Sequence, residues 1–168
     1  MTEAKIAAPP IRRVVTGHDR AGKAKVLIDA PAKNVKMAPG SPNRSVLMWV
    51  TDEMPCAMPL GEDIVDEGDR ILGTPPPENG TRFCVIEFGP HTTGQMHRTE
   101  TVDYVIAISG KIDMTMDGEE KVTLNPGDIL IQRGTNHQWN NPYDEPSRVA
   151  FVLIDAKPLG IGHPRPRE

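Results

Sequence analysis

The chain has few of the features that mark secreted, membrane-bound or nucleic-acid-binding proteins. Its two cysteines, Cys56 and Cys84, have no metal-type spacing, and we expect Cys84 to be a reduced core residue, with a Cys56–Cys84 pair as the alternative. No apolar run approaches the roughly 20 residues of a membrane span, and the N-terminus lacks the apolar core of a secretory signal. The net charge is −4 and the basic residues are scattered, which argues against a nucleic-acid surface. We therefore expect a cytoplasmic protein with no membrane or nucleic-acid partner.

The chain also lacks a convincing amphipathic helix, while its 15 glycines and 17 prolines favour turns. From Thr81 onward, apolar runs alternate with turn signals about every 8–12 residues, which is typical of a sandwich or barrel. Asp117-Gly118 predicts a tight hairpin turn, and residues 125–128 predict another. A length of 168 residues suits one domain with a sizeable core. The predicted fold class is all-β.

Three segments are expected along the chain. Residues 1–44 form an N-terminal arm and hairpin, with strand-like runs at 11–16 and 24–29 and a linker at 30–44. Residues 45–157 form the main barrel, and residues 158–168 form a solvated C-terminal tail. Inside the barrel segment, residues 52–80 are irregular and proline-rich, so we expect this long loop to be functional or mobile.

The most informative segment for chemistry is 97–103. Side chains at even spacing on a strand share one face, so His97, Thr99, Thr101 and Asp103 are expected to point the same way. A second histidine, His137, comes from a distant strand. Two imidazoles and one carboxylate are the ligands of a facial metal site with open positions. The alternative for each residue is structural: hydrogen-bonded core histidines, and a strand-end carboxylate bonded to backbone amides.

These residues resemble the two motifs of the cupin superfamily, in its small single-domain form. The first motif, H-x-H, three or four residues, E, six residues, G, corresponds here to His97-x-Thr99, Asp103 and Gly110. The second motif is matched by its later part, Gly134-x2-His137-x3-Asn141, although its proline is absent. The motifs lie within residues 91–141. The resemblance implies a cupin jelly-roll β-barrel with an N-terminal strand extension and a central cavity.

The resemblance also implies one divalent transition metal, iron, manganese, zinc or nickel, held here by His97, Asp103 and His137. Thr99 replaces the second motif histidine and Asp103 replaces the glutamate. His91, on the loop before the strand, is a possible fourth ligand, although a plain loop residue is the commoner interpretation. The expected function is a metal-dependent enzyme acting on a small organic molecule, of dioxygenase, isomerase or decarboxylase type. The alternative is a metal-free cupin that binds a small ligand without catalysis.

The remaining expectations concern the pocket wall and the assembly. Candidate pocket residues are Thr99, Thr101, Arg133 and Trp139, although packing or a surface position is the ordinary role of each type. Similar cupins often exchange N-terminal strands between subunits. We therefore expect a homodimer, because the first 50 residues offer more strand than a minimal barrel needs.

Overall fold

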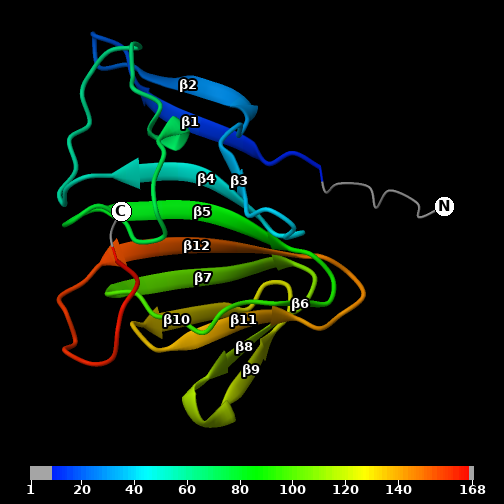
Figure 1. Ribbon diagram of the computed structural model, residues 1–168. Coiled ribbons are helices and arrows are strands. Elements are labelled where there is room, and N and C mark those ends of the chain that lie inside the picture. The colour runs from blue at the N-terminus through cyan, green and yellow to red at the C-terminus, as the bar shows by residue number, and fades with distance from the viewer. Residues whose placement is uncertain (1–8, 167–168) are drawn as a thin grey trace.

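The computed structural model describes residues 9–166, and strands arranged in three sheets account for most of its regular structure (Figure 1). The first eight residues of the expected arm and the last two of the expected tail lie outside this range. The strands are β1 Arg12–His18, β2 Ala24–Pro31, β3 Val35–Met37, β4 Arg44–Thr51, β5 Thr81–Phe88, β6 Thr92–Thr93, β7 Thr101–Ser109, β8 Ile112–Met116, β9 Lys121–Leu124, β10 Ile129–Arg133, β11 His137–Asn141 and β12 Ser147–Asp155. Two short 3-10 turns are η1 Glu67–Asp69 and η2 Asp117–Glu119. The all-β prediction is confirmed.

A six-stranded sheet faces a four-stranded sheet across the core. The large sheet has the order β10-β7-β12-β5-β4-β3 and the small one β6-β11-β8-β9. Large apolar side chains from both sheets meet between them: Phe88, Val105, Ile112, Met114, Leu124, Trp139, Val149, Phe151 and Leu153. The regular apolar–polar alternation after Thr81 arises because successive residues of a strand point to opposite sides of the sheet. The prediction drawn from that alternation is confirmed.

The N-terminal hairpin of β1 and β2 lies beside the outer strands of the large sheet (Figure 1). Ile11 and Ala32, at the base of this hairpin, pack on a second apolar cluster formed by Val46, Met48, Val85 and Ala150. Cys84 belongs to the core between the sheets and its neighbour Val85 to this second cluster, so β5 is buried on both faces. The hairpin therefore covers apolar surface that β4 and β5 would otherwise expose.

Residues 30–44 and the histidine segment differ from the expectation. The expected linker contains β3, whose Val35 pairs with Val46 of β4, so this segment joins the large sheet. The regular strand β7 begins at Thr101, and His97 makes only an isolated bridge to His137. Residues 9–166 contain no helix of the length and apolarity that a membrane crossing requires.

Gly110 and Gly118 provide a matched test of how tightly the sheet ends are packed. Both have a left-handed backbone, with φ of 67° and 70°. A Cβ at Gly110 would lie 2.4 Å from the Pro146 carbonyl oxygen, whereas one at Gly118 would meet nothing within 4 Å. We predict that Gly118→Ala lowers the free energy of unfolding by about 1 kcal/mol, from backbone strain alone. Gly110→Ala should cost at least about 3 kcal/mol, because overpacking adds to that strain. Equal losses in urea denaturation would contradict this packing.

Candidate active site

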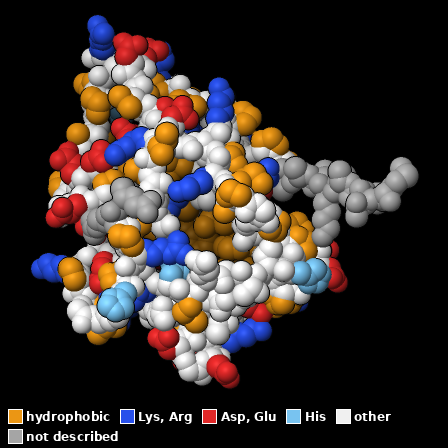
Figure 2. Space-filling view, viewed as in Figure 1, with side chains coloured by type: hydrophobic (Ala, Val, Ile, Leu, Met, Phe, Trp, Pro, Cys, Tyr) orange, Lys and Arg blue, Asp and Glu red, His pale blue; other side chains and the backbone are white. Residues whose placement is uncertain are grey.

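A cavity of about 260 Å³ lies between the two sheets and opens near the middle of the face of the molecule shown in Figure 2. Its inner wall is apolar and consists of Ile86, Phe88, Trp139, Phe151 and Leu153. Polar and charged side chains line the rest: Lys36, Ser45, Thr74, Arg82, Gln95, His97, Thr99, Asp103, His137 and Arg165. An apolar pocket with a few converging polar groups is the usual form of a small-molecule site.

His97 and His137 are held together by their own backbones. The His97 amide donates to the His137 carbonyl at 2.9 Å, and the His137 amide donates to the His97 carbonyl at 2.8 Å. Residues paired in this way project their side chains to the same face of the ladder. The ring centroids lie 4.4 Å apart, with 50° between the ring planes. The sequence prediction that these two distant histidines meet in the barrel is correct.

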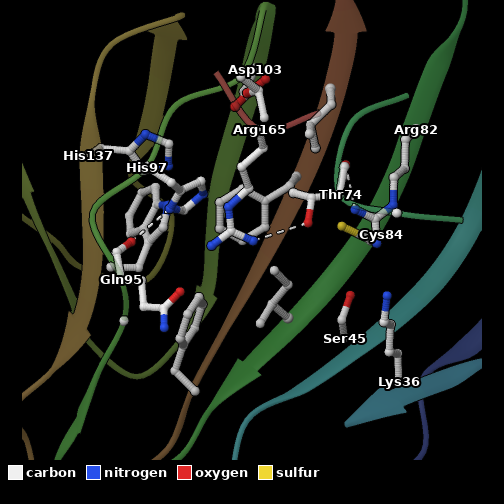
Figure 3. Close-up of a pocket in the computed structure, with 18 residues that line it drawn as sticks. Lys36, Ser45, Thr74, Arg82, Cys84, Gln95, His97, Asp103, His137 and Arg165 are labelled. Carbon is white, nitrogen blue, oxygen red and sulfur yellow. Dashed lines mark hydrogen bonds between the residues drawn. The ribbon is translucent and has the colours of Figure 1, made fainter. Parts of the chain in front are cut away.

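His97 has a fixed tautomer. Its Nδ1 lies 2.8 Å from the Gln95 carbonyl oxygen. A carbonyl oxygen only accepts hydrogen bonds, so Nδ1 carries the hydrogen and the lone pair is on Nε2. Burial lowers the pKa of His97, and the nearby charge of Arg165 lowers it further, against a smaller raising effect of the Gln95 bond. His97 is therefore a neutral imidazole with a basic nitrogen at the cavity (Figure 3).

His137 is more deeply buried, and protein groups surround both of its ring nitrogens. Nδ1 lies 3.0 Å from the Thr135 carbonyl oxygen. The Gln132 amide nitrogen lies 2.6 Å from Nδ1 and 3.2 Å from Nε2. The tautomer of His137 decides which of these atoms donates, and in either tautomer both ring nitrogens have a polar protein neighbour. Burial lowers the pKa of His137 to about 4, so this ring stays neutral and orients its neighbours.

Asp103, on β7, is 5% exposed and lines the cavity, and its Oδ1 has no hydrogen-bond partner among the described residues. Burial raises the pKa of Asp103 to about 6, and the hydrogen bond from Thr101 only partly offsets that effect. The Thr101 hydroxyl also lies 2.6 Å from that of Thr99. Asp103 is thus a carboxyl group that gains its charge only as the pH approaches neutrality.

The donor set does not fit the two-histidine, one-carboxylate metal centre that the fold family implies. Within residues 9–166 no three His, Cys, Asp or Glu side chains gather in a way that could hold an ion. His97 and His137 are together, but the Gln132 amide nitrogen lies against both ring nitrogens of His137. Asp103 lies on β7 and also lines the cavity, but its side chain is apart from the two imidazole rings (Figure 3). We therefore derive no chemical step through a metal.

The other predicted residues divide into those at the cavity and those away from it. Thr99 and Trp139 line the cavity, and Thr101 lies buried behind Thr99. Arg133 is corrected to an exposed position, because its neighbour Gln132 occupies the inward side of β10. His91 is also exposed, with Nε2 3.0 Å from an Asp144 carboxylate oxygen, and it does not line the cavity.

Several cavity residues were missed by sequence reasoning. Gln132 is not among the residues that line the cavity, but it contacts the His137 ring from the inward side of β10, a position that strand parity alone predicts. Arg82 lies at the start of an apolar strand pattern, and nothing in that pattern indicated that its side chain would line a cavity. Arg165 lies in the segment expected to be a solvated tail, which instead folds back: its amide donates to the Arg98 carbonyl at 2.8 Å. The 52–80 loop contributes Gly73 and Thr74 to the cavity, so this loop is part of the wall.

The chain matches known proteins over most of its length. Residues 84–154 match the family model described as "Cupin domain". The "Cupin-domain-containing oxidoreductase virC" of Hypocrea virens is 30% identical over 162 residues, covering 92% of this chain and 82% of that protein. The chain belongs to the cupin family. The "Phomopsin biosynthesis cluster protein C'" of Diaporthe leptostromiformis is similarly 33% identical over 153 residues, covering 89% of this chain and 80% of that protein.

A solved structure supports the same fold. The Cnp3 cupin domain of Schizosaccharomyces pombe aligns with a TM-score of 0.53 at 11% identity, over 86% of this chain and 87% of that one. The predicted cupin jelly-roll is therefore confirmed, with two facing sheets of separate hydrogen-bonded ladders.

His137 and Asp103 predict opposite pH dependences of stability that nearly cancel. With a pKa of about 4 in the fold and 6.5 unfolded, His137 binds fewer protons when folded, so its contribution is lost as pH falls from 6.5 to 4. With a pKa of about 6 in the fold and 3.8 unfolded, Asp103 binds more protons when folded, so its contribution is lost as pH rises from 4 to 6. Each effect is worth about 3 kcal/mol.

We predict that the free energy of unfolding of the wild type changes little from these two groups between about pH 4 and 6. Compared with the wild type, the free energy of unfolding of Asp103→Asn should rise more steeply with pH across this window, and that of His137→Gln should rise less steeply or fall. Urea denaturation at a series of pH values measures both slopes. A slope that is unchanged from the wild type in either variant would contradict the burial of the group that was replaced.

Metal binding stays a prediction with a direct measurement. Elemental analysis of protein purified without a histidine tag tests the motif-based expectation of iron, manganese, zinc or nickel, and near-stoichiometric metal that His97→Ala removes would contradict the misfit of the donor set described above. His91→Ala is the matched control, because that histidine is outside the cavity. Metal-free protein that also takes up none of these ions would overturn the motif-based expectation.

Proposed function

We propose that this cupin is an enzyme that acts on a small organic molecule in the cavity, with His97 as the group that accepts a proton. The family relatives support an enzymatic role in biosynthesis, since their names include oxidoreductases and biosynthesis-cluster proteins. The cavity volume of about 260 Å³ suits a ligand of roughly one ring with short substituents.

The observation that carries this proposal is the arrangement of His97. Its Nδ1 donates to Gln95, so Nε2 has an available lone pair, and among the described residues no hydrogen-bond partner occupies that nitrogen. Burial lowers the pKa of His97, so the ring is unprotonated at neutral pH. A positioned, neutral imidazole beside an apolar pocket is the form that a general base requires.

The step assigned to His97 is removal of a proton from a carbon next to a carbonyl group. The C–H proton moves to Nε2, and the electron pair of that bond remains on the ligand as an enolate. Return of the proton from Nε2 to the same or another atom of the ligand completes an exchange or an isomerisation. His137 supports this step as a neutral neighbour, because a charged imidazole 4.4 Å away would oppose protonation of His97.

A second candidate function is binding of a small ligand without catalysis. The incomplete metal-ligand set favours it, since Thr99 replaces the motif histidine and Asp103 stands apart from the imidazoles. This candidate predicts binding in the cavity that does not depend on the basicity of His97.

Deuterium exchange distinguishes the two functions. We predict that the wild-type protein accelerates exchange of the benzylic protons of phenylacetone and phenylpyruvate in D2O, measured by mass spectrometry. His97→Gln removes the base and should reduce the acceleration by roughly 100-fold or more. The expected rate should also fall as the pH drops and His97 becomes protonated.

His91→Gln is the matched control and should retain the wild-type exchange rate, because His91 is exposed and paired with Asp144. Ligands that bind without any His97-dependent exchange would favour the binding protein over the enzyme.

A further inference from the structure

Two arginines at the cavity differ from the other arginines in the interior. The buried and half-buried arginines elsewhere in residues 9–166 each form an ion pair with a carboxylate: Arg13, Arg44, Arg70, Arg98 and Arg148. Arg82 and Arg165 have no Asp or Glu within ion-pair distance in that part of the chain, and both line the cavity. Among the buried and half-buried arginines of residues 9–166, only these two at the cavity therefore lack a carboxylate partner.

Arg82 is the more demanding of the two. It is 8% exposed, its Nη1 donates to the Thr74 carbonyl at 2.7 Å, and its Nε is buried without a partner among the described residues. Burying a charged group without a partner is costly, because the charge loses its hydration. A ligand atom that accepts from Arg82 would remove much of that cost.

Thr74 brings the second guanidinium to the same place. Its side-chain hydroxyl lies 3.4 Å from Nη1 of Arg165, while its carbonyl accepts from Arg82. Figure 3 shows the Arg165 side chain between the histidine pair and Arg82. The guanidinium groups of Arg82 and Arg165 both contact Thr74 and therefore repel each other. A negative charge between them would offset this repulsion.

The backbone fixes Arg165 in this position. Its amide donates to the Arg98 carbonyl, and the Arg98 guanidinium in turn donates to the Ile161 carbonyl at 2.6 and 3.0 Å. The Leu159 amide donates to Glu100 at 3.1 Å. The C-terminal segment is therefore anchored at three points beside the cavity.

The mouth of the cavity has the same sign of charge. A second recess of about 210 Å³ shares Lys36, Gly73, Thr74 and Arg165 with the cavity and is lined also by Pro166. Asp103 is the single carboxylate among the cavity-lining residues. In the large sheet, Leu153 pairs with Arg82 on one side and with Asp103 on the other, so a strand separates the two charged residues.

We infer that the substrate class is a small organic carboxylate, whose anionic group lies between Arg82 and Arg165 and whose apolar body lies against Phe88, Trp139 and Phe151. This inference rests on the proposed function, because it names the substrate of the same cavity. A guanidinium offers paired N–H donors that match the two oxygens of a carboxylate. The cavity volume of about 260 Å³ and its mostly apolar inner wall favour a carboxylate on a small ring over a larger, multiply charged phosphate.

Matched pairs of probes test the charge requirement. Benzoate is compared with benzamide, and phenylacetate with phenylacetamide, by calorimetric titration of the whole chain. Within each pair the shape is kept and the negative charge is lost. We expect each acid to bind the wild type at least tenfold more tightly than its amide.

Arg82→Met and Arg165→Met should each reduce acid affinity by roughly tenfold or more while amide affinity changes little. Arg20→Met is the matched control, since the exposed Arg20 is away from the cavity, and it should retain the wild-type preference. Far-UV circular dichroism verifies folding, and the Arg165 variant keeps the test valid even where a change at the buried Arg82 prevents folding.

Equal affinity for acid and amide, a preference that survives both cavity variants, or no binding of either acid at millimolar concentration would overturn the inference. Its failure is separable from that of the proposed function, because exchange into neutral phenylacetone depends on His97 and not on a carboxylate. His97-dependent exchange without acid preference removes the anion site alone. Acid preference without exchange removes the catalytic role alone.

Discussion

The pairing of β12 with its two neighbours is the interaction on which the rest of the site depends. β12 hydrogen-bonds to β5 on one edge and to β7 on the other, and β7 then pairs with β10. In register, Arg82 lies beside Leu153, Leu153 beside Asp103, and Asp103 beside Gln132. This one row crosses four strands, with neighbouring strands about 4.8 Å apart. A shift of one residue in β12 would turn its whole inward set to the outer face.

This register explains the electrostatic character of the cavity. Leu153 lies between Arg82 and Asp103 in the sheet, and these two residues do not form an ion pair with each other. Each of the two groups is therefore buried without the other as a partner. Burial raises the pKa of Asp103 to about 6, and Nε of Arg82 has no acceptor among the described residues. Interiors that serve only stability pair such groups, as Glu87 does with Arg44 and Arg148. At the cavity, Arg82 and Asp103 are buried without such a partner of opposite charge.

The sequence predicted the fold well, because the fold follows from local patterns. Alternation after Thr81 predicted strands, Asp117-Gly118 predicted the turn between β8 and β9, and motif spacing predicted that His97 and His137 meet. The site was predicted less completely. Even spacing predicts only that Asp103 faces the same side of the sheet as Thr101. Whether Asp103 approaches the histidines depends on how far along β7 it lies, and spacing alone does not give that position.

The largest omission was Arg165, which no periodicity could identify. Its position depends on a backbone hydrogen bond to Arg98, which lies 67 positions earlier in the chain. Arg165 itself lies in a segment rich in proline and glycine. This segment forms no regular helix or strand, so it has no periodic pattern, and its composition resembles that of an exposed tail. Arg133 shows the reverse error. It was proposed as a pocket residue because it is charged and lies beside the motif, but the alternation of side chains along β10 turns Gln132 inward and Arg133 outward.

The cavity is lined by residues from Lys36 to Arg165, so its wall is drawn from nearly the whole described chain. No early fragment of the folding chain contains both the apolar inner wall and the cationic mouth, and contacts between such distant positions form slowly. Occupancy of the cavity is therefore coupled to folding of the whole domain and not to a local element. A ligand bound there would raise the melting temperature of both sheets together. Thermal stability is thus a sensor that responds to the natural compound whatever reaction the compound undergoes.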